Sequence, residues 1–112
     1  MSRPHSSLGS SISELLVLKL LAKKEMYGYE LAKAVQSSTE QAITMGEGVL
    51  YPLLHALEVQ HLLRSRRETV SGRPRIYYRA TAKGQRRLER LITQWRRTRS
   101  ALETALGDQA YA

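Results

Sequence analysis

Residues 46–58 constrain the fold of this chain most, because they place a proline inside a helical pattern. Leu50, Leu54 and Leu57 recur at i, i+4 and i+7, which is the spacing of one buried helical stripe. Pro52 has no N–H, and its ring crowds the carbonyl group four residues earlier. We therefore expect an amphipathic helix that is kinked or irregular in its first turns.

The start of this stretch is bare of bulky side chains. Gly46 and Gly48 allow the backbone there to approach another surface closely. Tyr51, His55 and Glu58 form a second stripe that points away from the leucines. These features favour a recognition helix that enters a DNA groove. An ordinary amphipathic core helix is the alternative.

The charge of the whole chain favours a polyanionic partner. Its 112 residues carry a net charge of +8, and the isoelectric point is near 10.2. Nucleic acid is the first candidate for such a surface, and an anionic membrane is the second. A basic adaptor that binds acidic proteins or membranes, without specific recognition of DNA, remains the alternative function.

Enzyme and metal chemistry find little support in the sequence. There is no Cys, which excludes disulfides, thiolate chemistry and a Cys-based zinc site. His5, His55 and His61 show no metal-binding grouping, and there is no catalytic triad pattern or Gly-rich phosphate loop. No apolar run reaches the roughly 18 residues that a membrane span needs. We expect a cytoplasmic protein that is not an enzyme and uses no cofactor and no metal.

The residues before the central stretch complete a helix-turn-helix pattern. The Ser-rich segment 1–10 is expected to be a flexible arm. A helix is expected over residues 11–23, where Ser11 and Glu14 have capping-box spacing. This helix is apolar around most of its circumference, so a second subunit could cover part of it. A second helix over residues 29–37 gives the pair helix-turn-helix proportions.

A basic hairpin follows the central helix. Residues 64–69 are expected to form a strand, 70–74 a turn with Gly and Pro, and 75–81 a β-branched and aromatic return strand. Such a hairpin after a helix-turn-helix is a wing. Glu68 is its only acidic residue. The basic tip predicts contact with DNA phosphates, and the alternative is a solvated hairpin whose charges only keep the protein soluble.

The C-terminal segment predicts a long helix over residues 82–106, capped by Thr81 and ended by Gly107. Its apolar residues fall close to heptad spacing, which is typical of a helix that packs against another helix. This stripe consists of Leu88, Leu91, Ile92, Trp95, Leu102 and Leu106. We therefore expect a homodimer, with residues 82–107 as the dimerisation helix and 108–112 as a frayed tail.

Three blocks of the sequence resemble the signature blocks of the PadR family of bacterial transcriptional regulators. They are residues 27–31, 48–58 and 72–84. Their order and spacing fit the family, and the match covers about residues 12–106. The resemblance implies a winged-helix dimer that usually represses promoters and releases DNA on a signal. The single short C-terminal helix resembles the smaller branch of the family, in which some members bind flat aromatic compounds between subunits.

Three departures from the family pattern limit what the resemblance implies. The chain has Gln60 and His61 where the family usually ends its recognition helix with Gly, and His adopts the left-handed conformation at some cost. Val49 replaces a small hydroxyl residue, so the target DNA sequence cannot be carried over. Pro74 replaces a frequent basic residue at the wing tip, which stiffens the turn and removes a charge.

The predicted fold class is mainly α with a small β-hairpin: a winged helix-turn-helix over residues 11–81, followed by the dimerisation helix. A symmetric dimer would place its two recognition helices roughly 34–36 Å apart on an inverted-repeat operator in double-stranded DNA. The residues expected in the major groove are Glu47, Val49, Tyr51, Pro52 and His55. Those expected to meet phosphates are Lys33, Arg64, Arg73 and Arg75, with a wing arginine in the minor groove.

Trp95 has two interpretations. It is the only Trp in a chain without Phe, and it lies on the predicted dimer stripe. As a core anchor it would bury a large apolar area. As a ligand platform, two Trp95 rings would face each other across the dimer axis and hold a small aromatic effector, with Leu15 and Leu18 lining the same space.

Overall fold

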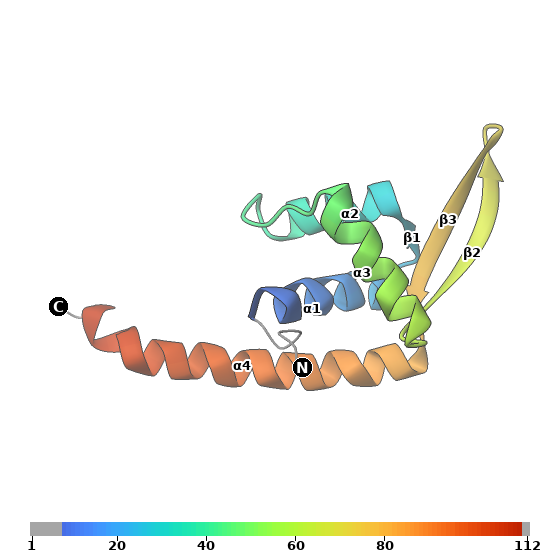
Figure 1. The fold of residues 1–112 in the computed structure, drawn as a ribbon. Coiled ribbons are helices and arrows are strands. Elements are labelled where there is room, and N and C mark those ends of the chain that lie inside the picture. Colours follow the sequence, from blue (N-terminus) through green and yellow to red (C-terminus); the bar gives the residue numbers. More distant parts are fainter. Residues whose placement is uncertain (1–7, 111–112) are drawn as a thin grey trace.

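The computed structural model describes residues 8–110 of the chain (Figure 1). Its elements are α1 (Leu8–Lys23), β1 (Met26–Tyr27), α2 (Gly28–Ser38), α3 (Glu47–Val59), β2 (Leu63–Val70), β3 (Arg73–Ala80) and α4 (Ala82–Ala110). The strands form one antiparallel sheet in the order β1-β3-β2. Figure 1 shows α4 running along the base of the molecule and the β2–β3 hairpin rising from one of its ends. The predicted fold class is confirmed.

One apolar core joins α1, α2, α3 and the start of α4. Its fully covered side chains are Val17, Leu18, Leu21, Leu31, Val35, Leu50, Leu54 and Leu57. The predicted leucine stripe is thus confirmed as the buried face of α3. Burying one such side chain contributes about 1.5–3 kcal/mol. These contacts fix α3 against the body and leave its opposite face toward solvent.

Helix α1 begins earlier than the sequence pattern predicted. It starts at Leu8 rather than at Ser11, so residues 8–10 are helical, and residues 1–7 of the predicted arm lie outside the described part of the chain. A serine is a weak start signal here, because helix ends are specified by sequence only to within a few residues. Leu15 and Leu16 are only partly buried, so α1 keeps an apolar flank beyond its core contacts.

Helix α3 ends in a Schellman motif. The Leu62 N–H donates to the Leu57 carbonyl (2.9 Å), and the His61 N–H donates to the Glu58 carbonyl (2.9 Å). His61 takes the left-handed conformation that this motif needs, with φ of 63°. The sequence prediction for His61 is therefore confirmed: a residue other than Gly adopts this conformation and bears its strain.

The wing is longer and its turn tighter than predicted. Strand β2 ends at Val70 and β3 begins at Arg73, so the turn consists of Ser71 and Gly72, both with positive φ (52° and 79°). Positive φ at both central residues is typical of a type I′ hairpin turn, which matches the twist of the flanking strands. The prediction that Pro74 belongs to the turn is wrong, because Pro74 lies within β3 opposite Thr69.

A two-residue strand went unpredicted. In β1, Met26 pairs with Tyr78 and Tyr27 with Tyr77 on the free edge of β3. Two residues carry no periodicity, so only the three-dimensional pairing defines this strand. Because β1 reaches only these two positions, β3 is an edge strand near Pro74, where a missing N–H is tolerated.

The start of α4 is fastened to the base of the wing. The Thr81 hydroxyl accepts the Gly84 N–H (3.0 Å), as its predicted capping role requires, and donates to the His61 carbonyl (2.7 Å). A Cβ on Gly84 would overlap the Leu62 carbonyl oxygen. This glycine therefore permits a backbone-to-backbone contact between α4 and the end of α3 that no larger residue allows.

Helix α4 continues past its predicted end. Gly107 does not stop it, and the helix runs through Ala110, which makes 29 residues or about 43 Å. A lone glycine weakens a helix without ending it when no left-handed turn follows. The predicted tail is therefore helical up to residue 110, and residues 111–112 lie outside the described part.

The predicted dimer stripe divides into two parts. Leu88 and Leu91 are buried in the chain's own core, where α4 packs against α1. The Arg87 guanidinium also bonds both Glu14 carboxylate oxygens (2.9 and 3.2 Å) across this contact, which raises the pKa of Arg87. The prediction that Leu88 and Leu91 serve dimerisation is corrected, because heptad spacing shows that a helix has a partner but not which one.

The far part of α4 extends beyond α1 (Figure 1). There Leu102 and Leu106 are exposed, at 46% and 61%. Ile92 and Trp95 lie between the two parts and are partly buried. The second half of the stripe thus has no covering element within residues 8–110.

Candidate nucleic-acid interface

The first turn of α3 is an open surface. Gly46 stands at its N-cap and Gly48 in its first turn, and a Cβ built on either one would meet nothing within 4 Å in the described chain. Val49 beside them is 55% exposed although it is apolar. No internal contact requires these glycines to be small. A partner whose surface approaches the backbone closely would require small residues at these two positions.

We expected Pro52 to make the first turns of α3 kinked or irregular, and it does not interrupt the helix. The helix is continuous from Glu47 to Val59 across it. The carbonyl that loses its N–H partner belongs to Gly48, which is exposed, so water can satisfy it. Pro52 and His55 are themselves exposed on the outer face of α3.

Tyr51 has a structural contact as well as an open face. It is 45% exposed, but its ring lies over the start of α2, and a Cβ on Gly28 would come within 2.5 Å of the Tyr51 hydroxyl oxygen. The Gly28–Tyr51 contact positions α2 against α3. Replacing Tyr51 would therefore affect packing as well as any contact with DNA.

Aromatic rings and cations gather where α2 begins beside the wing. Tyr27 stacks near Tyr29, with ring centroids 6.4 Å apart, and meets Tyr77 edge-on at 5.5 Å. Arg75 lies over the Tyr27 ring at 4.3 Å, and Lys33 over the Tyr29 ring at 5.5 Å. These cation–π contacts hold both cations near the N-terminus of α2, where the helix dipole also favours an anion.

The wing arginines differ in their contacts within the chain. Arg66 is occupied by Glu25 (2.7 Å) and by Glu68, and it lies 4.7 Å from the Tyr77 ring centroid. Its hydrogen bond also holds the pKa of Glu25 below the usual range. Arg73 is exposed beside the turn, whereas Arg75 folds back onto Tyr27 rather than projecting from the tip.

Arg64 lies apart from the other predicted phosphate-binding residues. It stands near the base of β2, opposite Arg79, and it lies seven positions before Ser71 of the turn. At about 3.3 Å per residue that is roughly 23 Å. Lys33, Arg73 and Arg75 can share one face with the start of α3, but Arg64 cannot, because it lies at the other end of the hairpin.

Sequence reasoning missed the aromatic part of this surface. Tyr29 is 61% exposed, and Tyr27 and Tyr77 support the two cations beside it. The signal was the concentration of tyrosines in a chain without Phe, since Tyr combines an apolar ring with a hydroxyl suited to a partly exposed surface.

The residues predicted to line an effector site are not all accessible. Leu18 is 0% exposed within the chain's own core, so it cannot wall an open site, and its prediction is corrected. Leu15 is partly buried on α1, and Trp95 is partly buried on α4. Amphipathic spacing could not separate Leu15 from Leu18, because both lie on an almost wholly apolar helix.

The arrangement as a whole defines a class of protein. A helix with a buried leucine face presents an open N-terminal turn, a preceding helix packs across it, and a hairpin with a basic edge stands beside it (Figure 1). This is the architecture of a winged helix-turn-helix DNA-binding domain.

Comparison with known proteins identifies the family within that class. Residues 17–90 match the model of the transcriptional regulator PadR-like family. A crystal structure of a PadR family transcription regulator from Clostridium difficile R20291 is 33% identical, with a TM-score of 0.72, and the match covers 83% of this chain and 96% of that one. The chain belongs to the PadR-like family of transcriptional regulators.

Two curated proteins are also similar to this chain. An uncharacterized protein of Lysinibacillus sphaericus is 28% identical over 79% of this chain and 82% of its own length. The transcriptional regulator Rv3488 of Mycobacterium tuberculosis is 39% identical over 70 residues, which are 62% of this chain and 63% of that protein.

The family assignment decides the broad function. The protein is a DNA-binding transcriptional regulator and not an enzyme. Within residues 8–110, no helix combines the length and apolar character required to cross a membrane.

Proposed function

We propose that the protein binds an inverted-repeat operator as a homodimer and represses transcription there. The observation that carries the proposal is the open first turn of α3, where Gly46 and Gly48 leave room that nothing in the described chain uses. A helix start with free N–H groups and no bulky side chains can enter the major groove and also bind a phosphate. The chain would act in the cytoplasm, because it must reach promoter DNA.

The proposed DNA surface combines the outer face of α3 with cations on both sides of it. The groove-facing residues are Glu47, Val49, Tyr51, Pro52 and His55. Lys33, Arg73 and Arg75 would bind phosphates, with Arg73 nearest the minor groove at the wing tip. Arg64 is left out of this surface because it lies at the base of the wing.

The proposed dimer interface uses the uncovered half of α4. Leu102 and Leu106 are exposed there, and the flank of α1 that includes Leu15 and Leu16 is only partly buried. A second copy of the chain would cover both regions, with Ile92 and Trp95 at the junction. Each subunit then places one α3 toward DNA, about one turn apart.

A charge introduced into the proposed interface tests the dimer. Leu102→Glu with Leu106→Glu should convert the dimer to a folded monomer, because two carboxylates would be buried without partners. Ser100→Glu with Thr104→Glu is the matched control, with the same charge and spacing at exposed positions. Sedimentation equilibrium distinguishes the two. A control variant that dissociates equally would assign the effect to charge alone.

Selection of bound fragments from random duplex DNA tests operator binding. The proposal expects an inverted repeat with half-site centres roughly 34–36 Å apart. Binding that is weak and insensitive to sequence would instead support the second candidate, a basic adaptor for acidic proteins or membranes. That candidate is favoured by one observation, the net charge of +8.

The release signal is proposed to be a small aromatic compound held between two Trp95 rings. The partial burial of Trp95 at the junction of the two halves of α4 supports this placement. Such a ligand would lower DNA affinity only if it prefers the spacing of α3 helices that does not fit the operator. Titration of Trp fluorescence with flat aromatics should show saturable quenching that competes with operator DNA. A Trp95→Leu variant that still responds would contradict it.

A further inference from the structure

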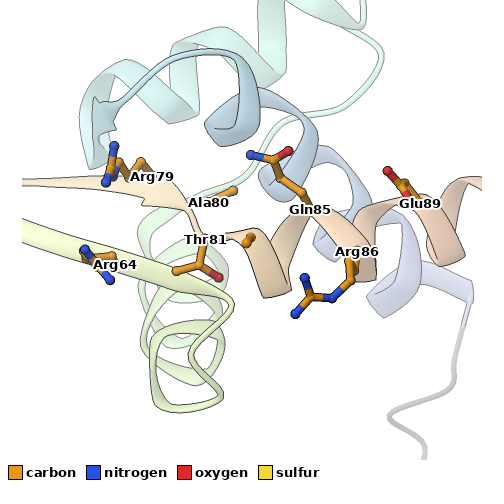
Figure 2. Close-up of a pocket in the computed structure, with 8 residues that line it drawn as sticks. Arg64, Arg79, Ala80, Thr81, Gln85, Arg86 and Glu89 are labelled. Atoms are coloured by element: carbon orange, nitrogen blue, oxygen red, sulfur yellow. The ribbon is translucent and has the colours of Figure 1, made fainter.

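The base of the wing carries an arginine cluster that the proposed DNA surface does not use. Arg64 of β2 and Arg79 of β3 are direct cross-strand partners, and Arg86 comes from the first turns of α4. Together with Thr81, Gln85 and Glu89 they line a hollow of about 500 Å³. Figure 2 shows the three arginines coming from three elements around Thr81. We call this group the basal arginine hollow.

The positive charge of the basal arginine hollow is not balanced by the protein. The side chains of Arg64, Arg79 and Arg86 have no hydrogen bond or ion pair with any residue from 8 to 110, unlike those of Arg66 and Arg87. Like charges directly opposite each other on a sheet are destabilising. The Arg64–Arg79 pair therefore lowers the stability of the hairpin, and no hydrogen bond or ion pair of these two side chains within residues 8–110 offsets this.

Two carboxylates lie near, and neither neutralises the cluster. Glu89 lines the hollow, but it projects from α4 on the side of Gln85, away from Arg86 (Figure 2). Glu25 interacts with Arg79 electrostatically, yet its oxygens are bonded to Arg66. The hollow is therefore lined by three guanidinium groups and one carboxylate, so it has an excess of positive charge.

The position of the hollow argues against a duplex as its partner. It lies at the foot of the hairpin next to α4, whereas the wing tip and the start of α3 lie at the opposite end (Figure 1). The distance from Arg64 to the turn is roughly 23 Å along the strand, more than the width of a DNA groove. A duplex held by α3 and the wing tip does not reach these arginines.

We propose that the basal arginine hollow binds a small, multiply charged oxyanion, of the phosphate or carboxylate class. Each guanidinium offers a planar fork that bonds two oxygens of such a group. The N-terminus of α4 adds its positive dipole end beside Ala82, which also lines the hollow. Three forks from three elements suit a ligand with several anionic oxygens better than a single monoanion.

Occupation of the hollow would link the wing to α4. The anion would tie β2 and β3 to the helix that carries the proposed dimer interface, and so fix the inclination of the wing. This consequence rests on the proposed function, whereas the binding itself does not. An effect of the anion on operator affinity is therefore a separate readout.

Calorimetric titration of the full chain with sodium pyrophosphate, and separately with citrate, tests the binding at constant ionic strength without DNA. The proposal expects saturable binding with one site per chain. Arg86→Gln and Arg79→Gln should each weaken it by tenfold or more. Arg90→Gln, an exposed arginine on α4 outside the hollow, should leave it unchanged. No saturable binding, or an equal loss in Arg90→Gln, would overturn the proposal.

Two further measurements test where the anion binds and whether the hollow also binds DNA. Amide chemical-shift changes on adding pyrophosphate should centre on residues 79–86 in the wild-type chain, and changes centred on α3 would overturn the assignment. DNA affinity of Arg86→Gln separates a free anion from a nucleic-acid phosphate. An unchanged affinity and salt dependence supports the free anion, and a loss as large as that of an Arg73 variant would make the hollow part of the DNA surface.

Discussion

The two ends of this molecule use glycine for opposite reasons. At one end, which we call the open end, the first turn of α3 and the wing turn are exposed, and Gly48 has empty space around it. At the other, the anchor end, Gly84 is buried where α4 meets Leu62, and its missing side chain is what permits the contact. A glycine can therefore leave space either for another part of the same chain or for a partner.

Apart from the basal arginine hollow, which lies at the anchor end, the side chains follow the same division. At the anchor end Thr81 joins α4 to the end of α3 through His61 and Gly84, so its polar groups are used within the chain. At the open end Val49 and Tyr29 are exposed although they are large and apolar or aromatic. Exposed groups of this kind beside cations are typical of a surface that is completed by a partner.

The largest expected effect is at the anchor end. Gly84→Ala should lower the free energy of unfolding by about 2–3 kcal/mol, because the new Cβ overlaps a carbonyl oxygen that cannot move without shifting the end of α3. Chemical denaturation measures the change. Gly107→Ala is the control: it lies in the same helix with open space around it, and it should be neutral or stabilising by about 0.5–1 kcal/mol.

A smaller effect, seen only in DNA binding, is expected at the tip of the open end. Arg73→Ala should leave the thermal midpoint unchanged, since the Arg73 side chain is exposed and has no hydrogen bond or ion pair within residues 8–110. It should weaken binding to all duplexes and reduce the slope of log K against log salt by about one. Anisotropy titrations over a salt series measure this. An unchanged slope would remove the tip from the interface.

The smallest expected effect is a gain in stability at the anchor end. His61→Gly should raise the free energy of unfolding by about 0.5–1 kcal/mol, because Gly adopts the left-handed conformation at the end of α3 without strain. Thermal unfolding near neutral pH measures it. A destabilised variant would mean that the imidazole makes a contact whose loss outweighs the relief of strain.

Much of the fold could be predicted because its signals are local. The spacing of Leu50, Leu54 and Leu57 defines the buried face of α3, and Thr81 marks the start of α4. The left-handed conformation of His61 was expected from the family resemblance, because the family usually has Gly at this end of the helix. Each of these features depends on neighbours within a few residues, which a single sequence displays.

What could not be predicted depends on partners far along the chain. Gly84 owes its role to Leu62, and Tyr51 to Gly28. Leu88 and Leu102 occupy the same position in the heptad pattern, yet Leu88 is buried against α1 and Leu102 is exposed. Arg64 and Arg79 lie in different strands, and only the register shows that they are direct cross-strand partners.

Gly48→Gln tests whether the empty space at the start of α3 is reserved for DNA. Gln is a good helix former and its Cβ would meet nothing within 4 Å in the free chain, so the thermal midpoint should stay within about 2 °C or rise. Affinity for the selected operator should fall by about 1–3 kcal/mol, since the side chain would stand between the backbone and the groove. Unchanged operator affinity in this folded variant would contradict the account.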